Sequence, residues 1–428
     1  MRRLLLLLIA LAAPVFAQDK PNVVILFADD LGYGDLSSYG HPIIRTPHLD
    51  GLASEGIRLT SFYSAPWCVP ARAQLLMGRY EQRIQMGATG SGGRDGIPEQ
   101  ERTLAEALGA VGYRTAMVGK WHLGSASPDY LPTGRGFDSW LGLPYSNDMR
   151  RPWVNSDAPL WLFDGPKKIE NPVDQDTLTT RYAARAVDFI ESAEDDPFFL
   201  YFAYSMPHLP LHTAQRFRGR SRAGLFGDVI ETIDWAAGEV LAALEATGHA
   251  DDTIVVFTSD NGPWLNLPDR MLAEGVQRWH AGTPGLLRGA KHTIYEGGVR
   301  VPGIIRWPGV VEPGRVSPEL VSTMDVHATL LSAAGASSPE LPLDGLDLTA
   351  FLQGDSASPR DEFFYFHRNQ LKALRLGPWK LKIDGTGPEL YQLELDPSEL
   401  YNRAADMPDV VERLQQRIDE MKKELGMS

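Results

Sequence analysis

The sequence predicts an α/β protein with a large mixed, mostly parallel sheet sandwiched between helices. A smaller C-terminal antiparallel sheet with one helix is expected to follow it. Short apolar runs alternate with helical patterns up to about residue 350, which is typical of a parallel sheet covered on both faces. Beyond that point the pattern changes to short strands separated by turns, and one amphipathic helix comes last.

Four apolar runs are predicted to be buried strands of the large sheet. They are PNVVILFADD (21–30), YRTAMVGK (113–120), PFFLYFAYS (197–205) and DTIVVFTSDN (252–261). Each run is short and bounded by polar or turn-forming residues, as expected of a strand buried on both faces. Helical patterns precede the last three runs: TLAEALGAVG (103–112), TTRYAARAVDFIESA (179–193) and GDVIETIDWAAGEVLAALEATG (227–248).

The C-terminal part reads as an antiparallel meander followed by a helix. The strand-like segments are FFYFHRN (363–369), KALRLGPWKLKID (372–384) and ELYQLELD (389–396). In the helix 407–425, apolar residues form one stripe at Val411, Leu414, Ile418, Met421 and Leu425, which predicts a packing face rather than a partner-binding surface. We therefore expect a main domain over 18–350 and an α+β subdomain over 351–428.

The first seventeen residues, MRRLLLLLIALAAPVFA, have the features of a secretory signal peptide. Two arginines precede an apolar core, and small residues form a cleavage site. The alternative is a membrane anchor, but the apolar run is too short to span a bilayer comfortably. The mature chain is therefore expected to be periplasmic or secreted, with no membrane association after cleavage.

The charge and cysteine content narrow the classes of function. The formal net charge is −14, which argues against a nucleic-acid binder, because such proteins need a basic surface. A pocket for a small anion can still be locally basic. The chain has one cysteine, so it cannot form an intrachain disulfide. A free thiol is easily oxidised in an oxidising compartment, so the presence of a single cysteine in this chain needs an explanation.

Two acidic pairs follow two of the predicted strands. Asp29 and Asp30 end the first apolar run, and Asp260 and Asn261 end the last. Because the carboxyl ends of parallel strands line the ligand crevice, three carboxylates and one amide oxygen are expected to converge there. Such oxygen ligands suit Ca²⁺ or Mg²⁺. The alternative, that each pair only caps a turn, is weaker for two pairs than for one.

The cysteine lies where a helix is predicted to begin, in SAPWCVPARAQLLMGRY (64–80). Pro70 suits a first helical turn, so Cys68 is expected at the helix N-terminus, where the helix dipole favours negative charge. Arg72 falls four residues later on the same face. A nucleophile beside a cation suits attack on an anionic ester. The alternative is a small buried thiol, a common fate of a free cysteine.

Further cations and imidazoles follow other strands. VGKWHLG (118–124) supplies Lys120 and His122, and YSMPHLPLH (204–212) supplies His208 between two prolines. Lys291 lies in the Gly-rich stretch 286–303. Lysine holds anions and histidine exchanges protons near neutral pH, although a single loop histidine is more often structural. His292 and Glu296 are expected to support their loop rather than react.

Taken in this order, the motifs resemble those of the type I, formylglycine-dependent sulfatases of the alkaline-phosphatase superfamily. They are CVPARAQLLMGR (68–79), which contains C-x-P-x-R, then GKWHLG (119–124), FTSDNG (257–262) and GAKHTIYEGG (289–298). GLPYSND (142–148) is most similar to the arylsulfatase A branch. The resemblance covers nearly the whole mature chain. It departs at Ala71, where serine is more usual, a position that tolerates variation.

The resemblance implies hydrolysis of a sulfate monoester to an alcohol or phenol and inorganic sulfate. A separate maturation enzyme that recognises C-x-P-x-R would oxidise Cys68 to formylglycine. One hydroxyl of the hydrated aldehyde would attack sulfur, and the other would then expel sulfate as the aldehyde re-forms. Asp29, Asp30, Asp260 and Asn261, with the formylglycine at position 68, would bind Ca²⁺.

The resemblance also implies roles for the remaining residues. Arg72 would hold the formylglycine diol, and Lys120, Lys291 and His208 would hold sulfate oxygens. We assign His122 to the diol proton, and His208 with Lys291 to the leaving group. Ser146 matches a substrate-side serine of the arylsulfatase A branch, and the alternative is a loop cap.

Two other functions remain open from the sequence. One is a phosphonate or phosphate ester hydrolase that uses the same aldehyde, and the other is a non-catalytic binder of sulfated glycans. The substrate, an aryl sulfate or a sulfated carbohydrate, is expected to be selected by loops 85–100, 145–178 and 262–285, because binding loops vary more than the scaffold. Trp153, Trp161 and Trp264 are candidates to stack on its ring.

Overall fold

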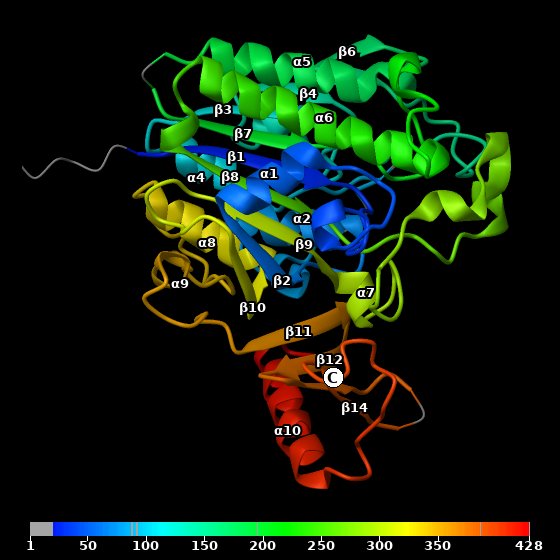
Figure 1. Ribbon diagram of the computed structural model, residues 1–428, viewed down its shortest axis with the longest axis vertical. Helices are drawn as coiled ribbons and strands as arrows, with labels where there is room; N and C mark the ends of the chain where they lie inside the picture. Colours follow the sequence, from blue (N-terminus) through cyan, green and yellow to red (C-terminus); the bar gives the residue numbers. More distant parts are fainter. Residues whose placement is uncertain (1–19, 87–88, 91–92, 195, 386, 428) are drawn as a thin grey trace, which may run out of the picture.

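The computed structural model describes residues 20–427 apart from 87–88, 91–92, 195 and 386 (Figure 1). It contains a ten-stranded sheet and a four-stranded sheet, with helices on both faces of the larger one, so the predicted fold class is confirmed. The predicted signal peptide, 1–17, lies outside the described residues. Among the residues that the structure describes, no helix combines the length and the apolar character needed to cross a membrane.

The larger sheet has a parallel centre, and antiparallel pairings occur on both sides of it. Its strand order is β10-β2-β9-β8-β1-β7-β3-β4-β5-β6. The central strands β8 (Thr253–Ser259), β1 (Asn22–Ala28), β7 (Phe198–Ala203), β3 (Arg114–Gly119) and β4 (Ser139–Gly142) are parallel. The four strands predicted from the sequence are thus the four neighbours β8, β1, β7 and β3.

The flanking strands determine which other segments reach the same edge of the sheet. β9 (Arg300–Arg306) runs antiparallel to both β8 and β2 (Ile57–Tyr63), and β10 (Arg315–Ser322) pairs parallel with β2. At the other side, β5 (Leu162–Asp164) and β6 (Lys167–Glu170) form an antiparallel hairpin next to β4. The end of β2 and the start of β9 therefore lie at the edge where β8, β1, β7 and β3 end.

Side chains of β1 alternate between two hydrophobic cores, as strand geometry requires. Val24 and Leu26 face a core shared with α1 (Pro47–Glu55), α5 (Leu178–Glu191) and α6 (Gly224–Ala246). Val23 and Ile25 face a core shared with α2 (Cys68–Met77), α4 (Leu104–Gly109), α8 (Thr323–Ala333) and α9 (Thr349–Gln353). The short helices α3 (Glu81–Ile84) and α7 (Glu296–Val299) lie in connecting segments.

The smaller sheet is an antiparallel meander, as predicted. It consists of β11 (Glu362–His367), β12 (Gln370–Leu376), β13 (Trp379–Lys382) and β14 (Glu389–Gln392), and α10 (Pro408–Glu424) packs on it. In Figure 1 this sheet and α10 form the narrow lower end of the molecule. Its core includes Tyr63, Val299 and Met324 of the main body. The division into domains near residue 350 remains a prediction.

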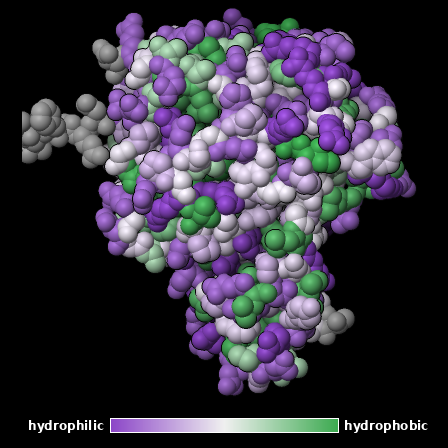
Figure 2. Space-filling view, viewed as in Figure 1, coloured by the Kyte–Doolittle hydropathy of each residue, from purple (hydrophilic) through white to green (hydrophobic). Residues whose placement is uncertain are grey.

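The surface carries hydrophobic side chains in small groups only, on the face that Figure 2 shows. Hydrophilic residues surround them over both the main body and the C-terminal part. This mixture is ordinary for the surface of a globular protein, since scattered apolar side chains are normal there.

Leu414 tests whether the apolar stripe of α10 holds the smaller sheet in place. It is fully buried in the core that the sheet shares with the main body. We expect Leu414→Ala to lower the free energy of unfolding by about 2–4 kcal/mol, because it removes buried methyl groups and leaves a cavity. Urea unfolding followed by circular dichroism measures this loss. Glu412→Ala, an exposed position on the same helix, is the control, and an equal loss in both variants would contradict the packing role.

Candidate active site

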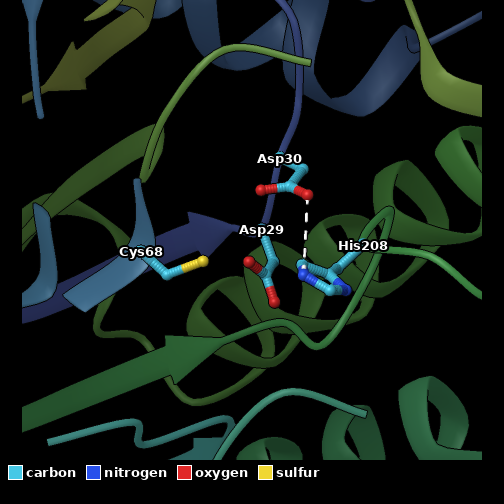
Figure 3. Close-up of side chains that lie close together, drawn as sticks. All are labelled: Asp29, Asp30, Cys68 and His208. Atoms are coloured by element: carbon cyan, nitrogen blue, oxygen red, sulfur yellow. Dashed lines mark ion pairs between the residues drawn. The ribbon is translucent and has the colours of Figure 1, made fainter. Parts of the chain in front are cut away.

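Polar residues gather where four neighbouring parallel strands end. Asp29 and Asp30 follow β1, and Asp260 and Asn261 follow β8. The segments after β3 and β7 bring the remaining residues, namely Lys120, His122 and His208. Figure 3 shows Asp29, Asp30, Cys68 and His208 close together, and one ligand atom from each of these four lies within 4.8 Å of the others. The structure thus brings the predicted residues to one edge of the sheet.

Cys68 reaches this edge because β2 ends beside it. The backbone N–H of Ser64 donates to Val299 O at 2.8 Å, and Ser64 Oγ donates to Asp260 O at 2.6 Å. These bonds fix the segment between β2 and α2, and α2 then begins at Cys68. The predicted helix-start position is confirmed. Cys68 Sγ lies 3.3 Å from Lys291 Nζ.

Lys291 arrives on the long segment that precedes β9. Its backbone N–H donates to Pro263 O at 3.0 Å, which ties it to the segment after β8. Gly262 allows the segment after β8 to lie close against the Lys291 segment, because a Cβ at position 262 would lie 1.8 Å from Gly297 O. Only glycine permits backbones to come this close. The Gly-rich stretch thus places the Lys291 ammonium beside Cys68.

Three buried cations neutralise three buried carboxylates at this site. Lys120 Nζ lies 2.7 Å from Asp29, Lys291 Nζ lies 2.6 Å from Asp30, and Arg72 Nη2 lies 3.0 Å from Asp260. Burial lowers the pKa values of Arg72 and Lys291, but the carboxylates raise them more, so both shift upward. Both side chains therefore stay charged although they are buried.

The oxygen donors fit the predicted divalent cation. Asn261 Oδ1 is buried and has no hydrogen-bond partner among the described residues. An unsatisfied buried carbonyl oxygen is costly unless something else binds it. It belongs to the residue next to Asp260, and Asn261 Nδ2 donates to Asp30 Oδ1 at 2.7 Å. Carboxylate and amide oxygens are the ligands that Ca²⁺ prefers.

Both predicted histidines contact neighbouring residues through Nδ1. His208 Nδ1 lies 2.7 Å from Leu209 O and 3.1 Å from Asn147 Oδ1, and its Nε2 lies 3.7 Å from Asp30. Two carbonyl acceptors at Nδ1 favour the hydrogen there, which leaves Nε2 facing the carboxylate. His122 Nδ1 lies 3.4 Å from Ser146 Oγ. Ser146 is therefore beside His122, at the edge of the site.

Burial keeps both imidazoles neutral. Burial lowers the pKa of His208 to about 4, although Asp30 opposes the shift. Burial also lowers the pKa of His122 well below its usual range, and Lys120 and Arg72 lower it further. Each ring therefore has one nitrogen able to accept a proton.

For the unmodified Cys68 thiol, burial outweighs the favourable position at the helix start. Burial raises the pKa of Cys68 to about 12, and Lys120 and Lys291 offset only part of this shift. The sequence indicated the helix start and the cations, but it does not reveal that the thiol is almost fully buried.

Among the candidate stacking residues, only Trp264 contacts the predicted catalytic residues. Its ring centroid lies 5.8 Å from that of His208 and 4.9 Å from Lys291 Nζ. Trp153 is buried in the hydrophobic core with Arg150 over its ring, and Trp161 packs at the margin of the other core. Asn147, which holds His208, was not predicted as a site residue, although it lies within the quoted PYSND motif.

Glu296 supports the Lys291 segment through the smaller sheet, as expected for a residue that does not react. Lys380 Nζ lies 2.9 Å from Glu296 and 2.8 Å from Glu399, and it also donates to Ile294 O at 2.7 Å. Glu399 in turn accepts from the backbone N–H of Glu296 at 2.7 Å. His292, the other residue assigned to loop support, is exposed and contacts Trp67 and Trp264.

The fold and the site define a class: an α/β protein in which a buried thiol, carboxylate and amide oxygens and three buried cationic side chains meet at the edge where the parallel strands end. The chain belongs to the sulfatase family, whose model matches residues 21–336. A second model, that of the C-terminal part of N-sulphoglucosamine sulphohydrolase, matches 289–424. As the sequence motifs indicated, the protein is a sulfuric ester hydrolase.

Individual relatives agree with this membership. The chain is 38% identical to human arylsulfatase A over 464 residues, which cover 96% of this chain and 89% of the relative. It is 38% identical to canine N-acetylgalactosamine-6-sulfatase over 403 residues, 89% of this chain and 74% of the relative. The crystal structure of PsFucS1 sulfatase from Pseudoalteromonas sp. superposes with a TM-score of 0.82 at 31% identity, covering 94% of this chain and 91% of that one.

The buried carboxyl of Glu399 is expected to make the stability of the folded state depend on pH. Burial raises the pKa of Glu399 to about 7. At Glu296, burial also raises the pKa, but Lys380 and neighbouring arginines lower it more, so that it falls to about 2. The folded state thus holds a proton on Glu399 that the unfolded chain releases near pH 4.5. Stability should therefore fall as pH rises from about 4.5 to about 7. Glu296 contributes no slope in this range, because its stabilisation is lost only below about pH 4.5.

Glu399→Gln removes this titration and should flatten that part of the profile. The measurement is the melting temperature at intervals between pH 5 and 8. Glu394→Gln, at an exposed position of the same segment, is the control and should keep the wild-type slope. The assignment fails if Glu399→Gln and wild type have parallel profiles.

Proposed function

We propose that the protein hydrolyses sulfate monoesters with a formylglycine made from Cys68 and with a bound Ca²⁺. The observation that carries the proposal is the position of Cys68. It begins α2 within 3.3 Å of Lys291 Nζ, and its sulfur lies within the same 4.8 Å cluster as Asp29 and Asp30. A nucleophile made there would lie between the cations that hold an anionic ester and the oxygens that hold a metal.

Lys120, Lys291 and Arg72 are proposed to hold the reacting groups. Lys120 and Lys291 are buried ammonium groups that suit sulfate oxygens. Arg72 shares Asp29 with Lys120 and also pairs with Asp260. Because their own ion pairs already fix these side chains, little reorganisation is needed when the substrate enters. Lys120 further donates its backbone N–H to Ala203 O at 2.8 Å, which anchors it to β7.

The two histidines are proposed to move protons. His122 would take the proton of the nucleophilic hydroxyl, and its Nδ1 contact with Ser146 sets the ring orientation. His208, with Nδ1 held by Leu209 and Asn147, presents Nε2 on the side of Asp30 and Lys291. It would act there with Lys291 on the leaving oxygen, and the proton would come from the Lys291 ammonium, because the neutral His208 ring carries no hydrogen at Nε2. Ser146 is proposed to contact the substrate from the His122 side.

Asp29, Asp30, Asp260 and Asn261 would hold Ca²⁺ together with the modified side chain of residue 68. When bound, the ion neutralises negative charge and polarises the nucleophilic hydroxyl. The unpartnered Asn261 Oδ1 supports this assignment. Mg²⁺ suits the site less well, because it tends to keep several waters and these donors are fully buried.

The formylglycine at position 68 would supply a hydrated aldehyde, whose two hydroxyls provide both the nucleophile and a way to release sulfate. Its formation requires a maturation enzyme acting on the C-x-P-x-R segment before folding buries it, since Cys68 is only 4% exposed. The basic and apolar N-terminal residues support export, so we place the mature protein in the periplasm or outside the cell.

The substrate is proposed to be an aryl sulfate or a sulfated carbohydrate. Arylsulfatase A and N-acetylgalactosamine-6-sulfatase, each 38% identical to this chain, are named for these two kinds of ester. An aryl sulfate is the simplest probe, because its leaving group is good and its product absorbs light.

Cys68→Ala tests the nucleophile. We expect this variant to lose turnover of para-nitrophenyl sulfate by a factor on the order of 10⁴ or more, with an unchanged melting temperature, because alanine is a good helix former. Mass spectrometry of the tryptic peptide 59–72 from the wild type should show the aldehyde in place of the thiol. Val69→Ala, at a variable position of C-x-P-x-R, is the control and should remain active.

Retention of wild-type turnover in Cys68→Ala would reject the proposed nucleophile. An unmodified thiol in an active wild-type enzyme would reject formylglycine. Faster hydrolysis of para-nitrophenyl phosphate or of a phosphonate ester than of the sulfate would favour a phosphoester hydrolase. Tight binding of sulfated glycans without turnover of any ester would favour the binding protein.

Calcium binding is tested by thermal unfolding without any activity assay. Added Ca²⁺ should stabilise the metal-free wild type by about 2.7 kcal/mol at a hundredfold excess over the dissociation constant. Asn261→Ala should reduce this stabilisation, because it removes a neutral oxygen ligand without adding charge. Asn155→Ala, at an exposed loop position, should respond as the wild type does. A melting temperature that Ca²⁺ leaves unchanged in the wild type would reject the metal site.

A further inference from the structure

A continuous row of rings leads from the catalytic residues to the second sheet. The centroid of Trp264 lies 5.8 Å from His208 and 5.9 Å from His292. Trp67 lies 6.4 Å from His292 and 5.4 Å from His367. We call Trp264, His292, Trp67 and His367 the ring row. It connects four stretches of the chain: the segment after β8, the Lys291 segment, the start of α2 and the end of β11.

The ring row is buried at Trp264, beside the sulfate-holding groups, and is more exposed at its other three members. Trp264 is 8% exposed and lies 4.9 Å from Lys291 Nζ. His292 is exposed, and Trp67 and His367 are partly buried. Trp67 also directly precedes Cys68. A molecule whose sulfate lies between Lys291 and Cys68 would therefore have its organic part close to these rings, whose apolar faces suit a sugar or aryl ring.

A cation follows the ring row at the turn between β11 and β12. Arg368 comes directly after His367 and is exposed. Gln82 Nε2 donates to Arg368 O at 3.0 Å, which ties the turn to the main body. No carboxylate among the described residues forms an ion pair with Arg368. The backbone of Arg368 is thus fixed directly after His367, and its exposed side chain has no ion-pair partner among the described residues.

The backbone at two of these positions is strained. Seven non-glycine residues in the described part of the chain have positive φ, and two of them, Asp30 and His122, are site residues. Two others are His292, with φ 68°, and Arg368, with φ 55°. Glycine or asparagine would adopt this conformation at lower cost. Strained non-glycine residues cluster at functional sites, where the side chain is needed despite the cost.

We propose that the ring row and Arg368 bind the alcohol portion of the substrate, and that this portion carries a second anionic group. The substrate class is then a sulfated carbohydrate with a further sulfate or a carboxylate near the scissile ester, rather than a simple aryl sulfate. Arg368 pairs with the second anion in a fork geometry that both groups accept. This inference rests on the proposed function, since it assigns the leaving-group side of the same site.

Arg368→Gly tests the inference and relieves the strained turn at the same time. The probes are sulfated N-acetylgalactosamine, its disulfated form, a disaccharide with one sulfate and one uronate, and para-nitrophenyl sulfate. We expect KM for the two dianionic probes to rise roughly fivefold, the upper range for a solvent-exposed charge pair, while kcat changes little. The ratio of kcat/KM for a dianionic probe over the monosulfated sugar should fall by the same factor.

Two further variants separate charge from structure. Arg368→Lys keeps the positive charge and should recover part of the lost preference. Arg413→Ala removes an exposed arginine from α10 and should leave all ratios unchanged. The melting temperature of Arg368→Gly should equal or exceed that of the wild type, because glycine accepts φ 55° without strain. A loss of preference without loss of stability therefore reports on binding.

The outcomes distinguish this inference from the proposed function. If the wild type hydrolyses no sulfate ester, the proposed function fails and this inference fails with it. If the wild type is active but Arg368→Gly keeps the wild-type ratios, the inference alone is overturned. A ratio that falls only for the disulfated sugar identifies sulfate as the second anion, and one that falls only for the uronate identifies carboxylate. Both results support the inference.

Discussion

The pairing of three buried carboxylates with three buried cations is the constraint on which the rest of the structure depends. Taking a charge out of water costs several kcal/mol, and only good geometry and full hydrogen bonding offset that cost. Asp29, Asp30 and Asp260 are fully or almost fully buried, as are their partners. Removal of any one partner would leave an uncompensated buried charge. The segments that deliver Lys120, Arg72 and Lys291 must therefore hold them within tenths of an ångström.

The smaller sheet contributes to this precision, although it supplies none of the predicted catalytic residues. Its Lys380 joins Glu296 to Glu399 and also holds the carbonyl of Ile294. Glu296 lies five residues after Lys291 on the segment that enters β9. The second sheet thus fixes the end of a long segment whose start is fixed by Gly262 and Pro263 after β8. The same sheet brings His367 and Arg368 to the ring row. On the proposed function, the second sheet would help both to position Lys291 and to recognise the leaving group.

The sequence predicted the parts of the fold that local patterns encode. β8, β1, β7 and β3 are buried on both faces, so each is a continuous apolar run that ends in polar residues. β2 (IRLTSFY) mixes polar and apolar residues, and β9 and β10 each contain a proline, so these strands gave no comparable signal. β4, β5 and β6 are three or four residues long, too short for a pattern to emerge.

The difference between local sequence patterns and long-range contacts also explains which site residues were predicted. Asp29, Asp260, Lys120 and His208 were predicted because each follows a recognisable strand. The contacts of Lys380 with Glu296, and of Trp67 with His367, join residues more than eighty positions apart, and no local pattern reports them. The raised pKa of the Cys68 thiol could not be predicted for a related reason: the helix start is a local feature, whereas burial is a property of the whole fold.

Recognition beyond the sulfate group has to come from outside the charge cluster. Inside it, all fixed charges are already paired, and the donors of Lys120, Arg72 and Lys291 suit any sulfate ester equally. Interactions that are the same for all substrates cannot discriminate between them. More accessible side chains lie outside the cluster at Trp67, His292, His367 and Arg368, and Arg368 has no ion-pair partner among the described residues. Selectivity is therefore expected to depend on Trp67, His292, His367 and Arg368, while the buried cluster supplies the chemistry that members of the family share.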